Sequence, residues 1–210
     1  MTLRLAAALA LLLGVAALMA YLNIMGRGPL AGAEARHLRA MKDRVSAPES
    51  VRDVTLDDFA ALPHGAPLAT VASIERRGVV AEGYVQRIMR AQDDDYHLEL
   101  APTPRTPGGP DTIYLSAEIT PGIRDGSQRW SYGALNAAFR PNRGGAARWD
   151  RGPRRVRVSG WLLYDYQYDA PPGEREKRTS APRISGWEIH PVTRIELWNE
   201  SLGRFVDLAR

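Results

Sequence analysis

The chain has 210 residues and a formal net charge of +4, which fits one domain with a real core plus an N-terminal extension. It contains no cysteine, which excludes disulfides, thiolate zinc sites and a cysteine nucleophile. Only two of its 28 basic residues are lysine, a bias typical of GC-rich coding, so the positive charge is weak evidence for nucleic-acid binding.

The N-terminal residues 1–25 predict a transmembrane or signal helix. After Arg4 come 18 uncharged residues, Leu5 to Leu22, close to the length of about 20 that spans a bilayer. We favour an uncleaved signal anchor; a signal peptide cleaved at Ala31-Gly32-Ala33 and a buried helix are the alternatives. Basic residues after the run would keep that side cytoplasmic, whereas early apolar segments more often export the downstream chain. We expect a single-pass inner-membrane protein with a periplasmic, extracytoplasmic C-terminal domain.

Residues 26–67 are punctuated by glycine and proline and predict a partly helical stalk or linker. Ala33 to Val45 is a candidate helix whose basic residues either remain solvated or contact anionic headgroups. Further on, Thr55-Leu56-Asp57-Asp58 resembles a capping box and predicts a short helix through Leu62.

Residues 68–210 predict one mainly β domain. The expected strands are Val79 to Met89, Tyr96 to Ala101, Asp111 to Ile119, Arg155 to Tyr168 and Gly186 to Trp198, with a helix from Ser131 to Phe139 between the third and fourth. Gly83 inside the first strand indicates a bulge or sharp coil that lets one strand serve two sides of a barrel. This order predicts a small five-stranded OB-like barrel with one short helix.

The last strand contains the string Trp-Glu-Ile-His-Pro-Val, from Trp187 to Val192, and comes after the strand Val156 to Asp165. In these residues the chain resembles a family of uncharacterised secreted or membrane-anchored bacterial proteins with OB-like barrels. The resemblance covers roughly the C-terminal 60 residues. It implies a fold and a location rather than an activity.

Two groups of side chains are candidate ligand-binding residues. Alternation along the last strand places Trp187 and Ile189 on a buried face, and Glu188 and His190 on a wetter one. Tyr164, Tyr166 and Tyr168 recur with period two, and they either close one end of the barrel or form an aromatic wall beside a ligand. The candidate ligand-binding set is Trp187, Glu188, His190, Tyr164, Tyr166 and Tyr168.

Many OB-folds bind polymers on the outer face of strands two and three. Here that face is expected to show His97, Glu99, Tyr114, Ser116 and Glu118, beside an acidic turn, so nucleic acid is an unlikely partner there. Basic residues gather elsewhere, around Trp149, and are either solvated or an anionic-surface site. That candidate anionic-surface set is Arg140, Arg143, Arg148, Arg151 and Arg154.

We therefore expect a non-catalytic OB-like module held at the membrane by its N-terminal helix, with a protein, peptide or envelope-polymer partner. We expect no cofactor and no metal, and an enzyme is less favoured than a binding module. An anionic-polymer binder that uses the Arg140 to Arg157 region is the first alternative. A metal-dependent hydrolase is the second, because His190, Glu188 and His97 would give three ligands if strands two and five approached each other.

Overall fold

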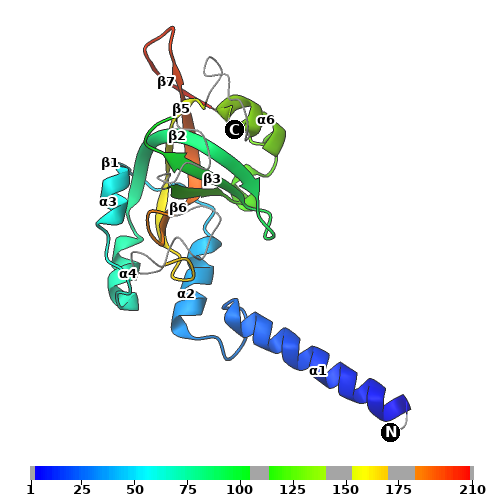
Figure 1. Cartoon of the computed structure of the whole chain (residues 1–210). Coiled ribbons are helices and arrows are strands. Elements are labelled where there is room, and N and C mark those ends of the chain that lie inside the picture. The colour runs from blue at the N-terminus through cyan, green and yellow to red at the C-terminus, as the bar shows by residue number, and fades with distance from the viewer. Residues whose placement is uncertain (1–2, 105–113, 141–152, 170–182, 209–210) are drawn as a thin grey trace. The chain divides into compact units, whose positions relative to one another are not determined.

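The computed structural model describes residues 3–104, 114–140, 153–169 and 183–208. The chain divides into two compact units, residues 1–43 and 44–210 (Figure 1). The first unit contains α1 (Leu3–Ile24) and α2 (Ala33–Lys42). Within α1, the stretch Ala6–Ile24 has a mean hydropathy of 2.2 and is long enough to cross a membrane. A signal sequence has the same length and composition, so α1 fits either description.

The second unit is mainly β, as predicted. Its strands are β1 (Arg52–Val54), β2 (Gly78–Arg90), β3 (Tyr96–Ala101), β4 (Leu115–Ile119), β5 (Arg155–Tyr164), β6 (Trp187–Asn199) and β7 (Arg204–Asp207). Its helices are α3 (Leu56–Ala60), α4 (Leu68–Ile74), α5 (Pro121–Arg124) and α6 (Tyr132–Phe139). Ser131 caps α6, because its side chain accepts a hydrogen bond from the backbone N–H of Ala134.

Five of the strands close into a barrel. Their order is β2-β3-β4-β6-β5, and β2 also pairs with β5, which closes the ring (Figure 1). The pairs are antiparallel except for the parallel contact of β4 with β6. With α6 between the third and fourth barrel strands, this is the connectivity of an OB-fold, so the predicted five-stranded OB-like barrel is confirmed. Two further strands extend it: β1 pairs with β2, and β7 with β6.

Strand β2 belongs to both sides of the barrel, as its internal glycine predicted. Tyr84 pairs with Arg155 of β5 and with Ala101 of β3, so the strand changes partner at this residue. A Cβ at the neighbouring Gly83 would lie 3.0 Å from the Ala101 carbonyl oxygen. Glycine therefore permits the close approach that the sharp coil of β2 requires.

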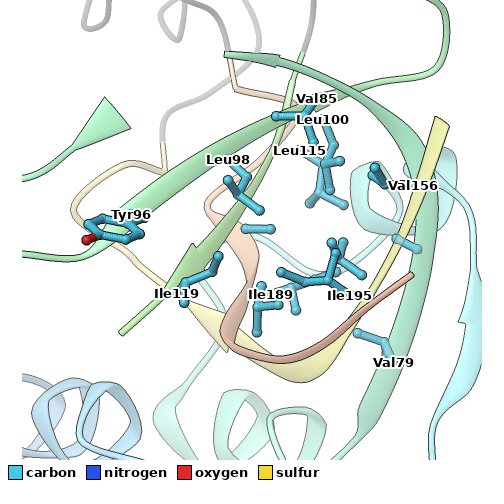
Figure 2. Close-up of a cluster of buried hydrophobic side chains, with 14 of the residues drawn as sticks. Val79, Val85, Tyr96, Leu98, Leu100, Leu115, Ile119, Val156, Ile189 and Ile195 are labelled. Atoms are coloured by element: carbon cyan, nitrogen blue, oxygen red, sulfur yellow. The ribbon is translucent and has the colours of Figure 1, made fainter. Parts of the chain in front are cut away.

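The core fills the barrel with aliphatic side chains from all five strands. In Figure 2, Leu98, Leu115, Ile189 and Ile195 point toward one another inside the ring, and each is fully buried. Each such side chain contributes about 1.5–3 kcal/mol on leaving water. The interior of the barrel is thus filled by core side chains.

The compact second unit begins at Arg44 rather than at Leu68, so residues 44–67 are part of the barrel domain and not of a separate stalk. Strand β1 adds to the barrel edge, and Phe59 of α3 is buried in the core. The predicted capping box at Thr55 is present, because its side chain and that of Asp58 cap each other's backbone.

Arg44 holds this segment on the barrel. Its guanidinium donates hydrogen bonds to the carbonyl oxygens of Glu75 (2.9 Å), Leu162 (2.9 Å) and His190 (3.3 Å), and it stacks over Trp161. Burial lowers the pKa of Arg44 to about 10, against the raising effect of Glu75. One side chain therefore joins the entering chain to α4, β5 and β6.

Candidate functional site

The first half of β6 is buried on both faces. Trp187 and Ile189 lie in the core, as predicted, but Glu188 and His190 are also 0% exposed. The predicted wetter face is therefore wrong. Alternation separates two faces of a strand without showing which face meets water, and here the polar face packs against other charged groups.

His190 lies between two glutamates from different strands. Its Nδ1 is 3.1 Å from Oε2 of Glu118 on β4 and 3.4 Å from Oε1 of Glu188. The other Glu118 oxygen, Oε1, is 3.3 Å from Nε2 of His97 on β3. Glu118 thus connects the histidines of β3 and β6.

The segment before β6 covers this group. Ile184 donates its backbone N–H to the carbonyl oxygen of Tyr114 at 2.7 Å, and Arg183 reaches Glu188 at 2.9 Å and Glu118 at 3.8 Å. Tyr114, Ser116 and Glu118, predicted on an outer face, are therefore buried. We call the assembled group the acid–histidine cluster: Asp95, His97, Glu118, Arg183, Glu188 and His190.

The cluster shifts the proton affinities of three of its members. Burial alone would lower the pKa of Arg183, but the charges of Glu188 and Glu118 raise it. Burial alone would lower the pKa of His190, but hydrogen bonds and charge from Glu118 and Glu188 raise it to about 10. Burial raises the pKa of Asp95 to about 6, against the lowering effect of His190. The two glutamates therefore favour the protonated, positively charged form of His190.

Three of these side chains converge closely enough to hold a metal ion. One ligand atom each from Asp95, Glu118 and His190 lies within 4.8 Å of the other two, and all three residues are buried. The sequence had indicated His190, Glu188 and His97 instead. It missed Glu118. The OB strand order could have indicated this residue, because that order places the third barrel strand, β4, between the second, β3, and the fifth, β6.

The three tyrosines do not form one stripe. Strand β5 ends at Tyr164, and the chain then turns, so Tyr164 is buried whereas Tyr166 and Tyr168 are 38% and 40% exposed. Tyr164 packs its ring on Trp187 and donates its hydroxyl proton to Asp169. The predicted strand through Tyr168 is wrong, because hydrogen bonds in this turn replace strand pairing.

A pocket of about 360 Å³ lies on the outer side of the barrel next to the cluster. We call it the face pocket. Its walls come from β2, from β3 and β4, and from the segment between β5 and β6. It is lined by Arg87, Met89, Arg90, Ala91, His97, Glu99, Tyr114, Ser116, Tyr168 and Arg183. Among the described residues, three guanidiniums and one carboxylate thus line it, and the guanidinium carbon of Arg183 lies 3.9 Å from the centre of the Tyr168 ring.

The face pocket differs from a larger hollow of about 800 Å³ lined by residues 46–52, β1 and α3. That hollow contains none of the predicted site residues. In the predicted anionic-surface set, Arg140 is exposed and Arg154 donates to the carbonyl oxygen of Trp198 at 3.1 Å. The other three, Arg143, Arg148 and Arg151, lie outside the described residues.

Comparison with known proteins gives structural likenesses alone. No protein-family model matches the chain, and no curated protein does. An asparaginyl-tRNA synthetase from Entamoeba histolytica is 16% identical, with 70% of this chain and 24% of that chain covered and a TM-score of 0.35. The Pyrococcus horikoshii asparaginyl-tRNA synthetase with asparaginyl-adenylate is 18% identical, with 65% of this chain and 22% of that chain covered and a TM-score of 0.33. The Entamoeba histolytica aspartyl-tRNA synthetase is 12% identical, with 73% of this chain and 27% of that chain covered and a TM-score of 0.33. The chain thus spans about a quarter of these proteins.

The prediction that nucleic acid is an unlikely partner is corrected. The solved structures reported above are tRNA synthetases, enzymes named for a nucleic acid. The physical ground for the prediction also fails, because it depended on an acidic outer face. Glu118 is buried, Glu99 pairs with Arg87, and Asp94 pairs with Arg90.

Proposed function

We propose that the protein is a non-catalytic OB-fold binding module, tethered to a membrane by α1, that binds an extended anionic polymer in the face pocket. OB-folds bind oligonucleotides and oligosaccharides on their second and third strands and on the loop between the fourth and fifth. In this chain these are β3, β4 and the segment between β5 and β6. The face pocket has walls from the same places. The observation that carries the proposal is its lining of three guanidiniums against one carboxylate.

Arg90 of the face pocket is available to a ligand although it has a partner. The Arg90 side chain is 65% exposed and pairs with Asp94, which is 40% exposed. Such exposed pairs contribute little to stability, so a phosphate or carboxylate of the ligand can replace the partner at small cost. Tyr168, with Arg183 against its ring, adds a platform on which a base or sugar ring can stack.

Loss of Arg90 is expected to weaken polymer binding. The probe is a fluorescent single-stranded oligonucleotide of about 12 nucleotides, within the range that OB-folds cover. Its anisotropy is titrated with the full-length protein in detergent, and inorganic polyphosphate serves as a competitor without rings. We expect Arg90→Ser and Tyr168→Ala each to weaken binding several-fold, and binding to fall as salt rises.

Arg194→Ser is the matched control, because Arg194 is also exposed and paired, with Asp207, but lies on β6 outside the face pocket. It should bind as the wild type does. Polyphosphate competition that survives Tyr168→Ala would show that charge, and not ring stacking, selects the ligand. Equal losses in Arg90→Ser and Arg194→Ser, or no binding of either probe, would refute the proposed site.

The proposed tether has its own test. Full-length protein is expressed with its N-terminus intact, and isolated membranes are washed at alkaline pH, which removes peripheral proteins. An anchor formed by Ala6–Ile24 predicts that the whole chain stays in the membrane pellet at its full mass. A shorter, soluble product would identify α1 as a cleaved signal sequence, and a full-length soluble chain would exclude both.

A further inference from the structure

We propose that Asp95, Glu118 and His190 form a binding site for one divalent transition-metal ion. Their ligand atoms lie within 4.8 Å of one another, and all three side chains are buried. One imidazole and two carboxylates form a donor set that zinc and its neighbours in the first transition row accept. The inference does not depend on the proposed polymer binding.

The charge of the acid–histidine cluster independently favours a bound cation. Three of its members, Asp95, Glu118 and Glu188, are buried carboxylates, and within the cluster the permanent positive charge is the guanidinium of Arg183. Charge buried without compensation is costly. A bound divalent ion would compensate the remaining negative charge.

Glu188 has the position of a residue that orients a metal ligand. Its Oε2 is held by Arg183 at 2.9 Å, and its buried Oε1 lies 3.4 Å from Nδ1 of His190, with no other partner in the described part of the chain. In metalloproteins a carboxylate that accepts from the ring nitrogen opposite the metal fixes the ring and raises its basicity, so this role of Glu188 requires the ion to bind Nε2 of His190. Glu188 is thus a positioning residue.

The face pocket gives the site a route to solvent. His97 and Ser116 line that pocket, and both approach Glu118, at 3.3 Å and 3.5 Å. An ion entering the pocket would pass these two side chains before it met Glu118. His97 is also close enough to Glu118 to add a second imidazole on the pocket side.

The test is titration of the full-length protein in detergent, stripped with a chelator and dialysed, with Co²⁺ and then Zn²⁺. The expected result is visible absorption that saturates at one Co²⁺ per chain and is abolished by Zn²⁺, with a rise in Tm when either ion is bound. Asp95→Asn and His190→Gln should lose the saturable signal. Glu188→Gln should keep the stoichiometry but bind about 10-fold more weakly.

Asp165→Asn is the matched control, because Asp165 is a fully buried aspartate in a turn and is not one of the three proposed ligands, although its charge acts on Arg183. It should titrate as the wild type does. Since substitution in the cluster can unfold the protein, a circular dichroism spectrum accompanies each titration to show that the variant is folded. The wild-type titration tests the metal site without any substitution. If wild-type protein binds neither ion saturably, or if folded Asp95→Asn binds as tightly as Asp165→Asn, the metal site is refuted.

Discussion

Replacement of Trp187 by alanine is expected to lower the free energy of unfolding by about 3–5 kcal/mol, the usual cost of removing a large buried aromatic side chain. Trp187 is fully buried, and its ring centre lies 4.9 Å from that of Tyr164. Its Nε1 donates a hydrogen bond to the carbonyl oxygen of Pro63 at 2.8 Å. The substitution would therefore leave a cavity and an acceptor without its donor.

Urea unfolding of the full-length protein, followed by far-ultraviolet circular dichroism, measures this loss. Trp187→Phe separates the two causes, because it keeps most of the ring but removes the donor, so about 1–3 kcal/mol is expected. Tyr166→Ala, at an exposed aromatic of the neighbouring turn, should change stability by less than about 0.5 kcal/mol. A Trp187→Ala loss no larger than that of Tyr166→Ala would contradict the described core.

Gly160→Ala is the second substitution with a large expected effect. A Cβ at this position of β5 would lie 2.2 Å from the carbonyl oxygen of Pro191 and 2.8 Å from Cγ2 of Ile189. Both contacts are with β6, the strand that pairs with β5 here, so backbone rather than a flexible side-chain end would have to move. We expect a loss of about 1–3 kcal/mol or more, measured by the same urea titration.

Gly133→Ala provides the opposite result in the same experiment. Gly133 lies on the exposed side of α6, and a Cβ there would meet nothing within 4 Å. Alanine is the better helix former, so a gain of about 0.5–1 kcal/mol is expected. If Gly160→Ala proved as harmless as Gly133→Ala, the close approach of β5 and β6 would be wrong.

The strands could be predicted because their patterns are local. Tyr96 to Ala101 and the helix ending at Phe139 match the structure closely, and the barrel could be inferred from their order. Gly83 was also informative, since its backbone does approach β3. These features depend on a few consecutive residues, which one sequence displays fully.

The acid–histidine cluster was not predicted, because it depends on which strands become neighbours and on what packs over them. Alternation separated Glu188 and His190 from Trp187, but exposure is decided by what packs on the polar face. That covering comes from Arg183, which lies before the strand, and from Glu118, far away in the sequence. Charged residues that bury one another look, in sequence, like a solvated surface.

The hydrogen bonds of Arg44 determine where the chain can be shortened. A truncated chain that began at Leu68 would lose Arg44, strand β1 and the buried ring of Phe59. The carbonyl groups of Leu162 and His190 would lose a charged donor, and core side chains would meet water. A soluble fragment for crystallisation or binding work therefore needs to start ahead of Arg44, and fragments that begin at Leu68 should aggregate.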